Sequence, residues 1–122
     1  MIGVSTRQRR LQVDRARIAA AARAALRAAR AARLDLSVSV VSDRAIRALN
    51  RDYLGHDRAT DVVSFPLRRS GDPDRLLGEV VVSADRALAE AAARRIPVEE
   101  ELLRYVVHGS LHLVGYDDGD PR

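Results

Sequence analysis

The chain has 122 residues, of which 47% are hydrophobic and 31% charged, and its formal net charge is +4. It contains no cysteine, which excludes disulfides and thiolate metal ligands. No apolar run reaches the roughly eighteen residues of a membrane span, and the amino terminus lacks the apolar core of a signal peptide. These features predict a soluble, cytoplasmic protein with no membrane contact and one domain over residues 1–122.

The charge is divided unevenly along the chain. Residues 1–33 contain nine arginines and one acidic residue, whereas residues 34–122 contain twelve arginines and sixteen acidic residues. Two interpretations of residues 15–33 remain open. The arginines there form either a solvated helix face or a stripe that holds a phosphate backbone without reading its sequence.

The amino-terminal part of the chain predicts two strands, each followed by a helix. The first strand is expected at about residues 2–6, and Asp14 is expected to cap a helix that runs to about residue 33. Residues 36–41 alternate in polarity and predict the second strand, after which Asp43 is expected to cap a helix through about residue 52. The buried stripe of the long helix is expected to consist of Ile18, Ala22, Ala25, Leu26 and Ala29.

The carboxy-terminal part predicts two more strands and two helices. A strand at residues 62–65, ended by Pro66, is expected to pair with a strand at residues 78–83. Ser83 is expected to cap a helix over residues 84–95. A last helix begins near Pro97, with three glutamates in its first turn. Its core residues are expected to be Leu102, Leu103, Val106 and Val107, with Arg104, Tyr105, His108 and His112 along an adjacent edge. The fold class that follows is α+β: one domain with a small mixed sheet of about four strands packed with helices.

The last helix carries a histidine pair that is typical of a metal site. His108 and His112 are four residues apart and therefore lie on one face of the helix. Gly115 is expected to adopt the left-handed conformation that ends a helix, which would turn Asp118 toward the same ion. Three protein ligands and an open position are typical of a catalytic zinc. The pattern predicts one Zn²⁺ per chain, held on the C-terminal helix and the following turn.

Three stretches of the chain resemble the YbeY family of bacterial rRNA-maturation endoribonucleases. They are VHGSLHLVGYD at residues 107–117, LNRDY at 49–53 with TDVVSFP at 60–66, and LGEVVVS at 77–83. The resemblance extends from about residue 36 to 118. It implies an α+β domain, a zinc-type ion, and hydrolysis of single-stranded RNA in rRNA maturation and ribosome quality control.

Two departures from the family pattern concern the activity. Asp118 stands where the resemblance implies a third histidine, and its negative charge would make the ion a weaker Lewis acid. Leu54 stands where the resemblance implies an arginine that contacts the RNA phosphate, so Arg51 and Arg58 become the candidate phosphate contacts. The sequence also ends soon after the motif, either as a fragment or as a naturally short form, and the third ligand in this terminal segment is expected to hold the metal more weakly.

Three classes of function follow from these residues. A metal-dependent, single-strand-specific endoribonuclease is favoured. A non-catalytic RNA-binding or ribosome-associated factor with a structural metal is the alternative. A metalloprotease is disfavoured, because Gly109 occupies the position of the glutamate that acts as general base in such enzymes. Ser64 is interpreted as a strand serine that satisfies its own backbone and not as a nucleophile.

Overall fold

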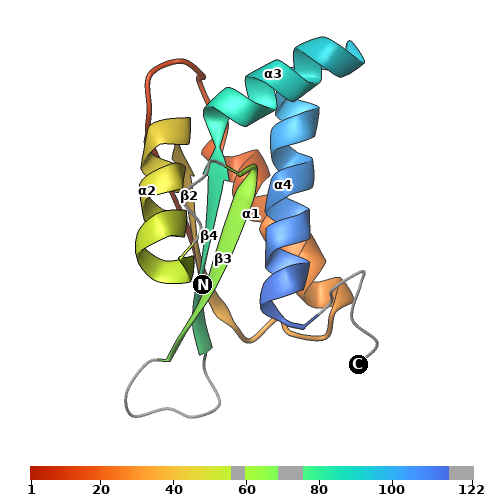
Figure 1. The fold of residues 1–122 in the computed structure, drawn as a ribbon. Helices are drawn as coiled ribbons and strands as arrows, with labels where there is room; N and C mark the ends of the chain where they lie inside the picture. The colour runs from red at the N-terminus through yellow and green to blue at the C-terminus, as the bar shows by residue number, and fades with distance from the viewer. Residues whose placement is uncertain (56–59, 69–75, 116–122) are drawn as a thin grey trace.

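The structure is a computed structural model that describes residues 1–55, 60–68 and 76–115 (Figure 1). In chain order its elements are β1 (Ile2–Arg7), α1 (Arg15–Ala28), β2 (Asp35–Val41), α2 (Asp43–Leu54), β3 (Val62–Arg68), β4 (Leu76–Ser83), α3 (Ala84–Arg94) and α4 (Val98–Leu113). The strands form one sheet in the order β1-β2-β4-β3. β1, β2 and β4 are parallel, and β3 is antiparallel to β4. The expected mixed sheet of four strands packed with helices is confirmed.

The helices form a layer on each face of the sheet. α1 and α4 run side by side over one face, α2 covers the other, and α3 crosses the end of the sheet above α4 (Figure 1). The larger core cluster joins α1 and α4 to the inner residues of β2 and β4, such as Val38 and Val80, which are fully buried. The smaller cluster joins Ile46 of α2 to Val41, Val63 and Val81. Successive side chains of a strand point to opposite faces, so the valine-rich strands supply both clusters.

Local hydrogen bonds explain where the helices begin. The side chain of Asp14 accepts the N–H of Arg17 at the start of α1, and the side chain of Ser83 accepts the N–H of Arg86 at the start of α3, as expected. The expectation that Asp43 caps α2 is wrong. Ser42 is the cap, and the Asp43 carboxylate instead accepts a hydrogen bond from the Ser83 hydroxyl at 2.6 Å.

Two element ends differ from the sequence prediction. α1 stops at Ala28, five residues early, because Arg30 takes a left-handed conformation with φ of 58° and the chain turns toward β2. Strand β3 continues through Pro66 to Arg68. β3 is an edge strand. A proline is tolerated there because an edge strand is hydrogen-bonded to a neighbour on one side only, and the position that lacks an N–H can face the open side.

The described helices are all too short or too polar to cross a membrane. α4 is the longest of them, at sixteen residues. It packs against α1, α3, β3 and β4, and it carries the histidine pair. The position of α4 therefore determines what surrounds the candidate site.

Candidate metal centre

The histidine pair lies exposed near the C-terminal end of α4. The ring centroids of His108 and His112 are 6.3 Å apart and the ring planes are inclined by 34°. Two imidazoles bound to one tetrahedral ion at about 2.1 Å would have centroids roughly 5 Å apart. The rings of His108 and His112 thus lie on one face of α4, about 1 Å further apart than two imidazoles on a shared ion would be.

Gly115 ends the helix region as expected. α4 ends at Leu113, the N–H of Gly115 donates to the carbonyl of His112 at 3.1 Å, and Gly115 has a φ of 95°. Asp118, the expected third ligand, lies outside the described residues. Within residues 1–55, 60–68 and 76–115, no cluster of three His, Asp or Glu side chains is close enough to hold a metal.

A close approach between α4 and the sheet fixes the residue next to His108. A Cβ atom added to Gly109 would lie 2.6 Å from Val80 Cγ1 and 2.7 Å from Val62 Cγ2. The Ser64 hydroxyl donates to the Gly109 carbonyl at 2.8 Å, so the expectation that Ser64 satisfies its own backbone is wrong. Position 109 faces the sheet without room for a side chain. A glutamate general base of the metalloprotease type therefore has no place there.

The two candidate phosphate contacts are not brought to the histidines by the described part of the chain. Arg51 lies on α2, in the layer on the opposite face of the sheet from α4, and its Nε atom donates to Asp52 at 3.0 Å. Arg58 lies outside the described residues. Leu54 is the last residue of α2.

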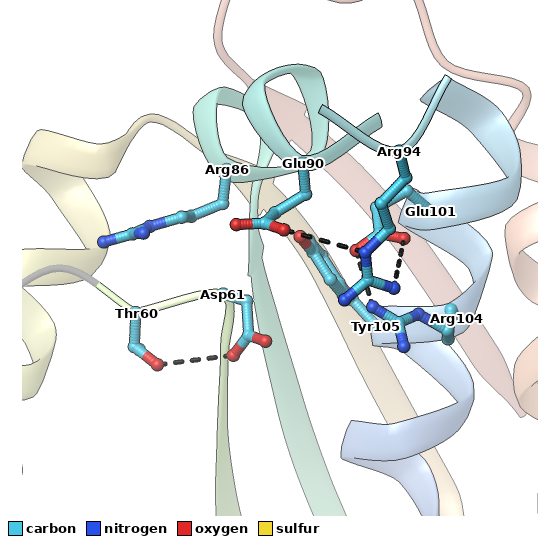
Figure 2. A pocket seen from close by; sticks show the side chains of 8 residues that line it. All are labelled: Thr60, Asp61, Arg86, Glu90, Arg94, Glu101, Arg104 and Tyr105. Atoms are coloured by element: carbon cyan, nitrogen blue, oxygen red, sulfur yellow. Dashed lines mark hydrogen bonds and ion pairs between the residues drawn. The ribbon is translucent and has the colours of Figure 1, made fainter. Parts of the chain in front are cut away.

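A polar cavity that the sequence did not predict lies nearer the N-terminal end of α4 than the histidine pair (Figure 2). Its volume is about 630 Å³, and its lining consists of Thr60, Asp61, Arg86, Glu90, Arg94, Glu101, Arg104 and Tyr105. Glu101 was expected in the first turn and Tyr105 along an edge beside the core residues; they are 0% and 3% exposed. Their spacing carried a signal, since residues 101, 105 and 109 lie four apart on the face that meets the sheet.

Glu101 is a buried carboxylate held between two arginines. Arg104 Nη2 donates to its Oε2 atom at 2.7 Å, and Arg94 Nη1 lies 3.7 Å from its Oε1 atom. Burial alone would raise the pKa of Glu101, but the hydrogen bond from Arg104 and the charges of both arginines outweigh it and hold the pKa below 4.5. Burial, together with the neighbouring Glu101, raises the pKa of the Tyr105 phenol. At neutral pH the site therefore contains an ionised Glu101 and a neutral Tyr105.

The sequence match to a known family covers almost the whole chain. Residues 3–122 match the family model of Endoribonuclease YbeY. The chain belongs to the endoribonuclease YbeY family. This confirms the resemblance carried by the three sequence stretches, including the motif that contains His108 and His112.

Individual YbeY relatives support the assignment to this family. The chain is 51% identical over 87 residues to Endoribonuclease YbeY of Anaeromyxobacter sp. (strain Fw109-5), a match that covers 71% of this chain and 45% of the relative. It is 41% identical over 113 residues to that of Rhodopirellula baltica, covering 91% and 57%. The chain thus spans about half the length of these curated relatives. The solution structure of TM1509 from Thermotoga maritima is similar across all of this chain and 80% of its own, with a TM-score of 0.61 and 27% identity.

Proposed function

We propose that this protein is a metal-dependent endoribonuclease that cuts single-stranded RNA in rRNA maturation and ribosome quality control. The observation that carries the proposal is the exposed pair His108 and His112, four residues apart on α4 of a YbeY-family fold. We propose His108, His112 and Asp118 as the ligands of one zinc ion per chain. The mixture of imidazole and carboxylate ligands suits zinc.

A bound zinc ion would polarise the scissile phosphate and lower the pKa of a coordinated water. The chain's own residues hold the site in place. Gly109 lets α4 lie against the sheet, and Ser64 ties the edge strand to the same turn of the helix. The exposed rings of His108 and His112 are thus presented on a rigid element. Arg51 and Arg58 stay proposed phosphate contacts.

The proposal extends to the setting of the reaction. We propose that residues 1–122 act as one endoribonuclease domain, that the RNA is ribosomal, and that the protein meets it on the ribosome in the cytoplasm. The names of the relatives support the nuclease part, since each is called an endoribonuclease.

A non-catalytic RNA-binding or ribosome-associated factor is the second candidate. Two observations favour it, namely Asp118 in place of a histidine ligand and Leu54 in place of an arginine. In this case the metal would fasten the last helix to the turn that follows it, and the protein would bind RNA without cutting it.

One experiment separates the two candidates. The purified protein is analysed for metal content, and cleavage of a single-stranded RNA is followed with and without a chelator. The nuclease predicts about one zinc per chain and cleavage that stops on chelation and returns with zinc. Metal without cleavage of any RNA, together with RNA binding, would favour the second candidate.

A further inference from the structure

The cavity beside α3 and α4 is lined by polar and charged side chains and does not include the histidine pair. Figure 2 shows Arg86 at one end and Arg94 with Arg104 at the other, with Thr60 and Asp61 below Arg86, just before β3. Its volume of about 630 Å³ lies within the usual range of ligand sites.

The carboxylates of the cavity are already engaged. Glu101 is fully buried between two arginines, and Glu90 Oε2 lies 3.7 Å from Arg94 Nε. Asp61 Oδ1 accepts the N–H of the following residue at 2.8 Å and also accepts the hydroxyl of Thr60. Each of these carboxylates therefore has a cation or a donor within the protein, although Glu101 Oε1 makes no hydrogen bond within the described residues.

Hydrogen-bond donors, in contrast, are in excess. A guanidinium has five N–H donors, and Arg104 directs one of its hydrogen bonds to Glu101. Arg86 Nε is buried, and it has no hydrogen-bond partner within the described part of the chain. The buried hydroxyl of Tyr105 lies beside Glu101, whose Oε1 atom is a buried acceptor without a hydrogen bond, so these two groups offset each other. A ligand that supplies only acceptors, such as a phosphate group, would satisfy the remaining arginine donors.

The cavity is aligned with the histidine pair. Arg104, His108 and His112 are exposed and follow one another at intervals of four residues, about 6 Å along the helix axis for each step. Strand β3 runs beside this face of α4: Asp61, just before the strand, lines the cavity, and Ser64 is hydrogen-bonded to Gly109 next to His108. A single strand of RNA lying along α4 and β3 would meet both sites.

We propose that the cavity is a subsite for the sugar-phosphate backbone of the RNA, an inference that rests on the nuclease function proposed above. Arg104 holds a phosphate group close to the histidine pair. Arg86 holds another phosphate group of the same strand at the far end of the cavity. The contacts are to phosphate alone, so the subsite positions the strand without selecting its sequence.

The first test measures RNA affinity with chelator present, so that cleavage plays no part. A fluorescently labelled single-stranded RNA is titrated with Arg86→Gln, and about tenfold weaker binding is expected from the loss of a charged phosphate contact. Arg44→Gln is the matched control, because Arg44 is an exposed arginine at the start of α2 on the opposite face of the sheet. Equal affinities of the two variants would overturn the proposal.

Arg104→Lys tests the end nearest the histidines. Lysine keeps a positive charge beside buried Glu101, so the fold is retained, but it loses the planar fork that pairs with phosphate. A raised KM for RNA with a smaller change in kcat is expected. An unchanged KM in both Arg104→Lys and Arg86→Gln would contradict the subsite.

The source of the phosphate is tested by competition. Unlabelled oligonucleotide is expected to displace the labelled RNA at far lower phosphate concentration than inorganic phosphate does. If inorganic phosphate competes equally well, the cavity is a free-anion site and the backbone subsite is wrong. If the wild type never cuts RNA but loses affinity through Arg86→Gln, the nuclease proposal fails and the subsite stands. If the wild type cuts RNA and both variants bind and cut equally well, the subsite alone fails.

Discussion

The hydroxyl of Ser64 donates a hydrogen bond of 2.8 Å to the main-chain carbonyl of Gly109, which joins the edge strand β3 to α4 one residue after His108. Ser64→Ala is expected to lower the free energy of unfolding by about 1 kcal/mol, the usual net value of one such bond. Chemical denaturation measures the change. Ser39→Ala is a suitable control, since the Ser39 hydroxyl pairs with that of Ser5 in an exposed contact. If Ser39→Ala loses more stability than Ser64→Ala, the hydrogen bond between Ser64 and Gly109 does not specifically stabilise the packing of α4.

Gly109→Ala tests the close approach of α4 to the sheet. The new Cβ would lie 2.6 Å from Val80 Cγ1, and Val80 is fully buried in a central strand. The clash is expected to cost about 1–3 kcal/mol, against a gain in helix propensity of about 1 kcal/mol, so a net loss of stability follows. Displacement of α4 should also weaken metal binding. Gly3→Ala is the control because no atom lies within 4 Å of its added Cβ. Equal stability of the two variants would contradict the tight packing.

Acid stability should report the buried carboxylate. The pKa of Glu101 is held below 4.5, so the unfolded chain takes up the proton first as the pH falls. The stability from ionised Glu101 is therefore complete above pH 4.5 and is lost as the pH falls through the lower pKa of the folded state. Thermal unfolding followed from pH 6 to 3 should show a shallower decline in Glu101→Gln than in the wild type. Parallel declines would show that Arg94 and Arg104 do not stabilise the charge.

Substitution of Asp118 tests the third metal ligand. Asp118→His is expected to keep the metal and to speed RNA cleavage at neutral pH, because removing the negative charge lowers the pKa of a bound water. Asp118→Ala should weaken metal affinity by about tenfold or more. Cleavage rates at limiting zinc should therefore rank His above Asp above Ala. Equal metal affinity in all three proteins would remove Asp118 from the ligand set.

Replacement of exposed arginines within residues 15–33 tests their part in RNA affinity. Arg23, Arg27 and Arg30 are exposed, whereas Arg17 is paired with Glu99 of α4. The triple glutamine variant should bind unrelated RNAs more weakly to a similar degree, and the slope of log affinity against log salt should fall by about 0.7 for each lost phosphate contact. Arg17→Gln is expected to change the slope less. An unchanged slope in the triple variant would assign these arginines to solvation.

Much of the fold could be predicted from the sequence because its signals are local. Caps such as Asp14 and Ser83 act within three residues, so both helix starts were predicted correctly. Pro66 did not end its strand, because its tolerance depends on the place of β3 at the sheet edge, which only the whole sheet determines. The early end of α1 was missed because an arginine, not a glycine, takes the left-handed position.

The candidate site, too, could be predicted only where its signals are local in the sequence. The histidine spacing and the Gly115 turn are encoded within eight residues of sequence, and Gly115 has the expected conformation. The charge cluster around Glu101 was missed since it includes Arg94 from another helix. Spacing alone did not distinguish a solvated first-turn glutamate from the centre of a polar cluster.

The sheet order also determines when during synthesis the protein can fold. Strand β2 has β1 on one side and β4 on the other, and its partner in β4 lies 42 positions later in the chain, as in the pair Val41 and Ser83. Until β4 leaves the ribosome, a valine-rich strand has one open edge and no second layer of core. Such non-local pairing slows folding and leaves the nascent chain open to association with other strands. Correct folding during synthesis therefore requires that β4 emerge and pair with β2 before the open edge of β2 pairs with another chain.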